Sequence, residues 1–312
     1  MAFIISLLFC IAPVVTSPNT ADINISEAVP IGGINQWISI KGTNRDNPVV
    51  LFLHGGPGNS VMGYAEKFTG ELQQHFVVVQ WDQRESGTTK KLNRSETPLT
   101  VTQMENDAVE MINYLRNRFS KEKVLLMGHS WGGFLGLLVA AEHPELLSGY
   151  VAISPMVYQV ESERLSREWM IEKAITDGRP KTVEELNSIS IPFASGRDLY
   201  YHRSWLAELS GQKFPSRRFV EAWAEKWLPL FNEASLVNFF EVAPTIKCPI
   251  YFFAGKLDFQ THAQLTWKYY NELVSTRKKW YWFEDTGHSI PSQSPQRLQD
   301  IVINEIIPDL KN

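Results

Sequence analysis

The sequence predicts an α/β fold with a mostly parallel central sheet, flanked by helices and interrupted by an inserted helical cap. Strand-like runs alternate with helical segments towards both ends of the chain, as they do where helices connect parallel strands. These runs are continuously apolar, which is typical of strands covered on both faces. A middle region has no such runs. A chain of 312 residues can bury one large core with an inserted subdomain.

The first part of the predicted core covers residues 18–154. Its strand-like runs are Ile34–Ile40, Val49–Leu53, Phe76–Trp81, Val124–Met127 and Gly149–Ile153. Helical patterning lies between them, at Met62–Gln74, Val101–Phe119 and Phe134–Glu142. This order favours crossover connections between parallel neighbours.

Residues 155–245 form the predicted cap, where charged residues and tryptophans are frequent and helical patterning dominates. The alternation of strands and helices resumes in residues 246–312. Strand-like runs occur there at Pro249–Ala254 and Trp280–Phe283, and helical segments at Ala263–Leu273 and Pro295–Ile307. The simplest architecture is one α/β core interrupted by a helical cap.

The composition argues against several classes of function. A net charge of -4 gives no electrostatic reason to expect a nucleic acid partner. The two cysteines, Cys10 and Cys248, do not make a disulfide framework. CxxC and HExxH patterns are absent, and the seven histidines do not cluster with metal-ligand spacing, so no metal is expected.

The N-terminal residues 1–17 form a candidate signal peptide. The stretch is apolar from Ala2 to Val15, which suits a signal-peptide core better than a membrane span of about 20 residues. If this segment is a cleaved signal peptide, the protein is exported, either secreted or periplasmic, and the mature chain has no membrane span. The alternative is an uncleaved apolar arm on a cytoplasmic protein, because the usual basic residues before the apolar core are missing.

A candidate nucleophile lies in the stretch GHSWGG, residues 128–133. It fits the G-x-S-x-G pattern, and it has a strand-like run before it and a helical segment after it. A tight strand-to-helix turn would present Ser130 as a nucleophile and direct the amides at the start of the helix towards developing negative charge. The alternative is a glycine-rich loop that only reverses the chain.

A serine hydroxyl needs a base, and the base needs an acid to orient it. Downstream of the cap, Asp258 and His288 each follow the end of a strand-like run, in the order that this arrangement requires. Four alternatives remain: Asp258 as a helix cap, His288 as a loop histidine, Asp285 as the acid, and His129 as the base. Asp258 fits the acid better than Asp285 does, because Asp285 lies only three residues before His288, on the same strand end, whereas the acid usually follows a separate strand. His129 is disfavoured as the base, because its side chain points elsewhere if Ser130 begins a tight turn.

Backbone donors for an oxyanion are expected in two places. The stretch HGGPG at residues 54–58 follows a strand-like run, and its glycines let the backbone approach a bound carbonyl. We predict Gly56 and Trp131, the residue after the serine, as the donors. The alternative for HGGPG is a plain glycine-rich turn.

These residues resemble the α/β-hydrolase superfamily, and within it the proline iminopeptidase branch of serine peptidases. HGGPG at 54–58, WDQR at 81–84 and GHSWGG at 128–133 carry the resemblance, which spans about residues 30–155 and 246–310. It implies a cofactor-independent enzyme that cleaves an N-terminal residue, often proline, from short peptides. By the same resemblance Ser130, Asp258 and His288 form the triad, and Gly56 with Trp131 forms the oxyanion hole.

The sequence departs from that family in two places. Arg84 is followed by Glu85 where the family usually has glycine, so the loop gains a charge. The cap also lacks the family's tryptophan-and-glutamate signature, which leaves the carboxylates that would hold a free amino group unidentified. The candidates are cap glutamates, and the alternative for each is a solvated helix face. They are Glu161, Glu168 and Glu208, with Glu163 and Glu172 beside them.

The sequence therefore predicts a serine aminopeptidase acting on a short peptide. A carboxylic-ester or lactone hydrolase with the same triad and a different cap is the alternative, because fold and triad do not separate the two. A non-catalytic ligand-binding protein on this fold is a third possibility. The sequence leaves the oligomeric state open.

Overall fold

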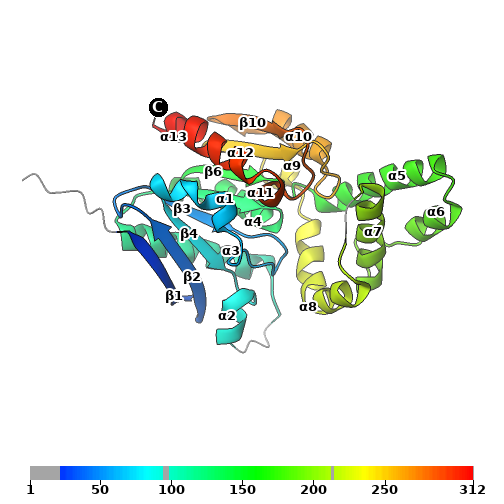
Figure 1. Cartoon of the computed structure of the whole chain (residues 1–312), viewed down its shortest axis with the longest axis horizontal. Coiled ribbons are helices and arrows are strands. Elements are labelled where there is room, and N and C mark those ends of the chain that lie inside the picture. The colour runs from blue at the N-terminus through cyan, green and yellow to red at the C-terminus, as the bar shows by residue number, and fades with distance from the viewer. Residues whose placement is uncertain (1–21, 94–97, 212–213, 312) are drawn as a thin grey trace, which may run out of the picture.

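The computed structural model describes residues 22–93, 98–211 and 214–311 (Figure 1). The predicted signal segment, residues 1–17, lies outside them. Eight strands form one sheet in the order β1-β2-β4-β3-β5-β6-β8-β10. The pairs β1–β2 and β2–β4 are antiparallel and all other neighbours are parallel, so the predicted α/β class with a mostly parallel sheet is confirmed.

The bounds of the strands agree with most of the predicted runs. The sheet consists of β1 (Ile23–Ile31), β2 (Ile34–Gly42), β3 (Val49–Leu53), β4 (Val77–Asp82), β5 (Val124–His129), β6 (Leu147–Ile153), β8 (Ile250–Gly255) and β10 (Lys278–Phe283). The short strands β7 (Thr245–Ile246) and β9 (Val274–Ser275) pair separately.

The helices of the core lie between these strands. They are α1 (Glu66–Thr69), α2 (Gly87–Leu92), α3 (Val101–Phe119), α4 (Trp131–Glu142), α10 (Ala263–Glu272), α11 (Ile290–Gln293), α12 (Pro295–Ile301) and α13 (Ile307–Leu310). Short 3₁₀ segments η1 (Glu71–Gln74) and η2 (Pro144–Leu146) and a π-helical turn, η3 (Val302–Ile306), complete them. The longest, α3, begins after Thr100, whose side chain accepts a hydrogen bond from the amide of Gln103.

Both faces of the sheet are covered, which explains the continuously apolar strands. In β3, Val49, Leu51 and Leu53 pack into one buried cluster with residues of α3, α4 and α10. Val50 and Phe52 pack into a second cluster, with residues of α1 and α12. Successive side chains of a strand point to opposite faces, so every position of β3 is buried.

Two elements of the core differ from the sequence-based expectation. β1 has no counterpart among the predicted runs; its burial alternates along the strand, and it pairs with β2 at the edge of the sheet through a turn at Gly32 and Gly33. The segment Met62–Gln74 is not one helix but a turn followed by α1 and η1. Gly63 and Gly70 within it lower its helical preference.

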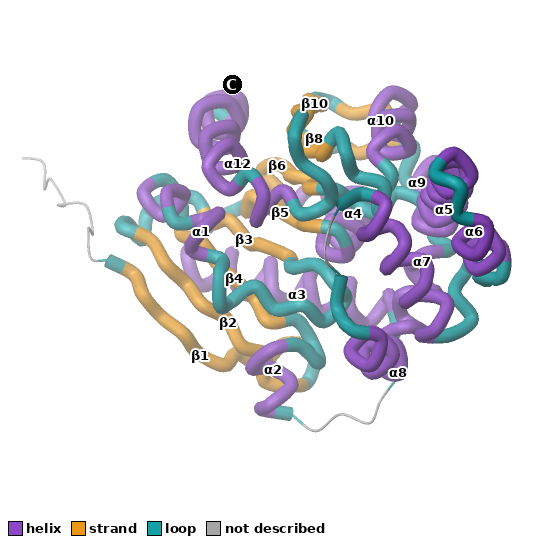
Figure 2. The backbone as a smooth tube through the Cα atoms, turned by 45° about the vertical axis from the view of Figure 1, so that its right-hand side comes forward, coloured by secondary structure: helices purple, strands orange, loops and turns teal. Residues whose placement is uncertain are grey.

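Between β6 and β7 the described residues form five helices and no strand of the sheet: α5 (Gln159–Thr176), α6 (Pro180–Asn187), α7 (Gly196–Leu209), α8 (Arg217–Ser235) and α9 (Phe239–Val242). Figure 1 shows α5 to α8 gathered at one end of the molecule, and Figure 2 shows them beside the sheet. We call these five helices and the loops between them the cap. Each of these helices contributes at least one buried apolar residue, such as Met170 of α5 and Leu206 of α7, to the same apolar cluster as α3 and α4. Among the described residues, no helix has the length and apolar character needed to cross a membrane.

Candidate active site

Ser130 lies at a sharp turn between β5 and α4. Its φ of 57° and ψ of -115° lie in a region that non-glycine residues rarely adopt. The neighbouring glycines make the turn possible by close packing. A Cβ on Gly128 would lie 2.2 Å from the carbonyl oxygen of Gly132, and a Cβ on Gly132 would lie 2.0 Å from that of Leu53.

The structure brings Ser130, His288 and Asp258 together. Nε2 of His288 lies 2.9 Å from Oγ of Ser130, and Nδ1 of His288 lies 3.0 Å from Oδ2 of Asp258. In the tautomer with the hydrogen on Nδ1, the imidazole donates to the carboxylate and accepts from the hydroxyl. Ser130 follows β5 directly, while Asp258 and His288 come from the loops that follow β8 and β10.

The environment of Asp258 favours its ionised form. Burial raises the pKa of this carboxyl, but the charge of His288 and hydrogen bonds from His288 and Thr261 together hold the pKa well below its usual range. The amides of Gln260 and Thr261 donate to Oδ1 at 2.8 and 3.0 Å, and the Thr261 hydroxyl donates to Oδ2 at 2.8 Å. Asp285, the alternative acid in the sequence, is exposed.

Unlike His288, His129 forms no hydrogen bond with the Ser130 hydroxyl. Its Nε2 donates instead to the backbone carbonyl of His288, at 2.9 Å. Burial, with the nearby His288, lowers the pKa of His129 to about 4, so its imidazole is neutral at pH 7. His129 therefore supports the loop that carries His288.

The two backbone segments expected to bind an oxyanion lie beside Ser130. Gly55 and Gly56 line the cavity into which Ser130 opens. Gly56 has a φ of 123°, a conformation that favours glycine. Trp131 is the first residue of α4, so its N–H is among the amides with no partner inside the helix.

The cavity at Ser130 has a volume of about 330 Å³. Much of its wall is apolar and comes from the cap: Leu199, Phe214, Pro215, Phe219, Val220, Trp223 and Phe231. Among the described residues that line it, Arg203 is the only one with a permanently charged side chain. A volume near 300 Å³ suits a small ligand or the end of a larger one.

None of the five cap glutamates is among the described residues that line this cavity. Glu161 pairs with Arg164 on its own helix, and Glu208 pairs with Arg179. Glu168 and Glu172 are exposed.

Glu163 alone among them is buried, and both of its carboxylate oxygens bind the guanidinium of Arg203. Burial raises the pKa of Glu163, but the charge and hydrogen bonds of Arg203, with His202 and Gln159, lower it overall. A buried carboxylate that already has a cation is not free to bind another.

Two other features bear on cofactors and disulfides. In residues 22–93, 98–211 and 214–311, no three His, Cys, Asp or Glu side chains are grouped so as to hold a metal ion. Cys248 is a buried free thiol whose pKa burial raises to about 12. Cys10 lies outside the described residues.

Sequence reasoning missed several residues that support the site. Gln83 donates from Nε2 to the carbonyl of His54 at 3.1 Å and accepts from the Trp131 indole at 3.0 Å, so it joins the loop after β3 to the start of α4. Thr261 orients Asp258. The stretch WDQR contains Gln83 and was a sequence signal for it, whereas no comparable pattern marks Thr261.

Comparisons with known proteins agree with this architecture. The family model described as alpha/beta hydrolase fold matches residues 48–295. A "Probable aminopeptidase YbaC" from Bacillus subtilis is 31% identical over 301 residues, covering 89% of this chain and 95% of that protein. A "Proline iminopeptidase" from Saccharolobus solfataricus is 28% identical over 208 residues, covering 64% of this chain and 63% of the relative.

A solved structure shows the same fold. The crystal structure of a proline iminopeptidase from Mycobacterium smegmatis superposes with a TM-score of 0.65 at 14% identity, covering 92% of this chain and 99% of that one. The resemblance drawn from HGGPG, WDQR and GHSWGG is confirmed at the level of the family. This chain therefore belongs to the α/β hydrolase fold family.

Proposed function

We propose that this α/β hydrolase is a cofactor-independent serine hydrolase whose nucleophile is Ser130, whose general base and acid is His288, and whose orienting acid is Asp258. The observation that carries the proposal is the continuous chain of hydrogen bonds from the Ser130 hydroxyl through His288 to Asp258, at the floor of a cavity large enough for a small substrate. The sharp turn at Ser130 exposes its hydroxyl to that cavity.

Acylation begins when Oγ of Ser130 attacks the carbonyl carbon of the substrate and its proton passes to Nε2 of His288. The backbone N–H groups of Gly56 and Trp131 donate to the oxyanion that forms, and removing one such donor typically costs about 2.7–4 kcal/mol. His288 then protonates the leaving group as its bond to carbon breaks. Water, deprotonated by His288, attacks the acyl-enzyme, releases a carboxylic acid and regenerates Ser130.

Among substrates we propose short peptides, cleaved at the N-terminus as by a proline iminopeptidase. Two curated relatives named aminopeptidase or proline iminopeptidase support this choice, one of them over nearly the full length of both chains.

A carboxylic ester or lactone is the second candidate, and one observation favours it. In the described part of the chain, the cavity wall has no carboxylate to hold the ammonium group of a peptide, and Glu163 is occupied by Arg203. A buried ammonium without a carboxylate partner is strongly disfavoured.

We also propose the division of the chain into a core of residues 18–154 and 246–312 with a cap at 155–245. The interruption of the strand order between β6 and β7 supports it. Residues 1–17 are proposed as an export signal.

A substrate panel on the purified enzyme separates the two candidates, with Ser130→Ala as the blank. It compares proline p-nitroanilide, its N-acetyl derivative, p-nitrophenyl acetate and longer acyl esters. An aminopeptidase hydrolyses the free proline anilide rapidly and loses that activity when the amine is acetylated. Hydrolysis of esters alone rejects the peptidase and supports the second candidate.

A further inference from the structure

Four consecutive residues of the loop after β4, Gln83 to Ser86, contact five parts of the molecule: the loop after β3, α4, α3, the turn between β1 and β2, and the cap. Gln83 joins the His54 carbonyl to the Trp131 indole, and the Ser86 hydroxyl lies 3.0 Å from Nε2 of His54. Because His54 precedes Gly55 and Gly56, and Trp131 follows Ser130, this loop supports both segments proposed to bind the oxyanion.

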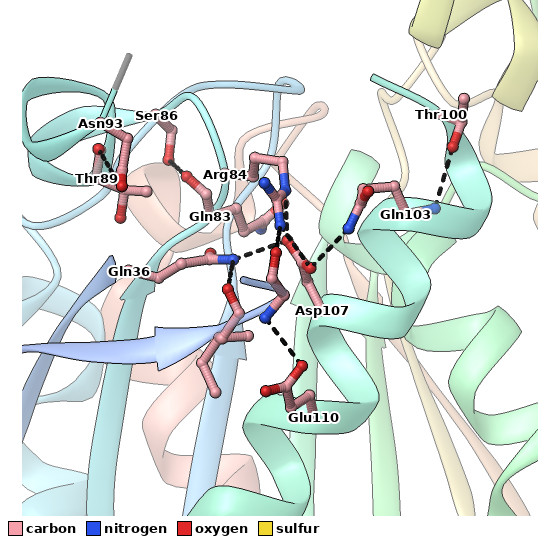
Figure 3. Close-up of polar contacts among 12 residues, drawn as sticks. Gln36, Gln83, Arg84, Ser86, Thr89, Asn93, Thr100, Gln103, Asp107 and Glu110 are labelled. Carbon is pink, nitrogen blue, oxygen red and sulfur yellow. Dashed lines mark hydrogen bonds and ion pairs between the residues drawn. The ribbon is translucent and has the colours of Figure 1, made fainter. Parts of the chain in front are cut away.

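Arg84 fixes the base of the loop. Its guanidinium donates to both oxygens of Asp107 on α3, at 2.8 and 3.0 Å, and to the carbonyl of Gly32 at 2.6 Å. Figure 3 shows Asp107 also receiving hydrogen bonds from Gln36 and Gln103. These contacts anchor the Arg84 side chain to α3 and to the turn between β1 and β2.

Glu85, the residue that departs from the family's glycine, points in a different direction. Its backbone φ is 61°, a left-handed conformation that disfavours a side chain such as glutamate. Its buried carboxylate binds the ammonium group of Lys226, which lies on the cap helix α8. The ion pair therefore connects the core loop after β4 with the cap.

The same stretch of α8 touches the loop after β3. The indole of Trp223 donates to the carbonyl of Pro57 at 3.0 Å. The ring of Trp227 covers Gly58 so closely that a Cβ there would lie 2.4 Å from it. Trp223, Lys226 and Trp227 are spaced at three and four residues, so one face of α8 makes all three contacts.

We propose that Glu85 and Lys226 form a latch: an ion pair that positions α8 against the loop of residues 55–58 and so fixes Gly56 beside Ser130. The ion pair and the hydrogen bond from Trp223 to Pro57 each join a polar atom of α8 to a core loop, whereas the ring contact of Trp227 with Gly58 permits sliding of the helix. The side chain of Lys226 remains 32% exposed, so the latch can form and break without unfolding the cap. Its effect on turnover rests on the proposed function; its effect on the loop does not.

The test uses the full chain with Glu85→Gln, Lys226→Met, the double variant and the charge-reversed pair Glu85→Lys/Lys226→Glu. Each keeps a side chain of similar size, and Lys226→Arg is the conservative variant. The control is Glu221→Gln, which breaks the exposed pair between Arg217 and Glu221 on the same helix without touching the core.

Three measurements test the latch. They are kcat and KM on a p-nitrophenyl ester, the rate of labelling by a fluorophosphonate, and hydrogen exchange of peptides covering residues 54–60. Each single variant should lower kcat and the labelling rate by about tenfold or more, because small displacements of catalytic groups are costly. KM should change less. The double variant should be no slower than either single one, since both remove the same interaction.

Lys226→Arg should retain activity, the reversed pair should recover part of it, and Glu221→Gln should stay within about twofold of wild type. Exchange of residues 54–60 should accelerate in Glu85→Gln and Lys226→Met but not in the control.

The latch is rejected if the single variants keep wild-type kcat, labelling rate and loop exchange, or if their effects on kcat add in the double variant. Failure of the proposed function gives a different result: the wild type itself does not label at Ser130. In that case hydrogen exchange alone decides whether the pair holds the loop.

Discussion

Asp258 holds the imidazole of His288 in one orientation, because its carboxylate accepts from Nδ1 while three other donors fix its own position. An amide at this position accepts or donates, so it would stabilise the tautomer that cannot accept the Ser130 proton.

Replacing Asp258 by asparagine should therefore lower kcat by about ten-thousand-fold with little change in fold. The measurement is kcat on the best substrate of the panel, with circular dichroism as a check on structure. Asp285→Asn is the matched control, since Asp285 is exposed, and it should leave kcat unchanged. A large loss in Asp285→Asn with a small one in Asp258→Asn would reverse the assignment of the acid.

His202 predicts a dependence of stability on pH. Its ring is fully buried and faces Glu163, Arg203 and Arg167; burial, partly opposed by Glu163, lowers its pKa from 6.5 to about 4. Between these values the unfolded chain binds a proton that the folded chain does not. The free energy of unfolding should therefore fall as the pH decreases from 6.5 to 4, by up to about 1.4 kcal/mol per pH unit for this group.

Urea unfolding of wild type and His202→Gln at several pH values between 4 and 7 measures this slope. His129, with a similarly lowered pKa, contributes in the same direction and keeps part of the slope in the variant. The variant should show a shallower slope, whatever its stability at pH 7. Equal slopes for the two proteins would mean that His202 does not titrate as described.

At the scale of residues, the sequence predicted the position of those side chains that directly follow the end of a strand. Ser130, Asp258 and His288 lie where parallel strands finish, and their order along the chain is informative. The position of Glu163 inside the cap could not be predicted in this way. Its burial and its pairing with Arg203 depend on how α5 packs against α7, and glutamates at helical spacing look alike in sequence whether exposed or buried.

At the scale of elements, the turn between β5 and α4 depends on close contact between main chains. A methyl group at Gly132 would lie 2.0 Å from the carbonyl oxygen of Leu53, and backbone on both sides leaves little room to move. Gly132→Ala should therefore destabilise the protein by about 1–3 kcal/mol or more.

Denaturant unfolding of Gly132→Ala measures this loss. Gly63→Ala is the control, because a Cβ there meets nothing within 4 Å. Equal midpoints for the two variants would show that the turn relaxes around a methyl group.

The elements predicted well were long and had clear signals at their ends. The helix expected at Val101–Phe119 has those bounds in the structure, with a Thr100 cap and a left-handed Ser120 after it. β1 was missed because it is an edge strand with half-exposed, alternating residues, unlike the apolar runs of the buried strands. The segment Met62–Gln74 has apolar residues at helical spacing, but its glycines divide it into short turns.

At the scale of the whole molecule, the cap and the core share one apolar cluster, and the cavity forms where they meet. Contacts between them join residues far apart in sequence; Glu85 and Lys226 are separated by 141 positions. No local sequence pattern predicts a pair so far apart along the chain. The sequence therefore indicated the unusual charge at Glu85 but not its partner, Lys226.

The whole account depends on Ser130 acting as the nucleophile, and covalent labelling tests this most directly. Wild-type protein treated with a fluorophosphonate should gain one adduct, which peptide mapping by mass spectrometry places on Ser130. Ser130→Ala should gain none, and His288→Ala should label far more slowly. An unlabelled wild type, or an adduct that persists in Ser130→Ala, would contradict the account.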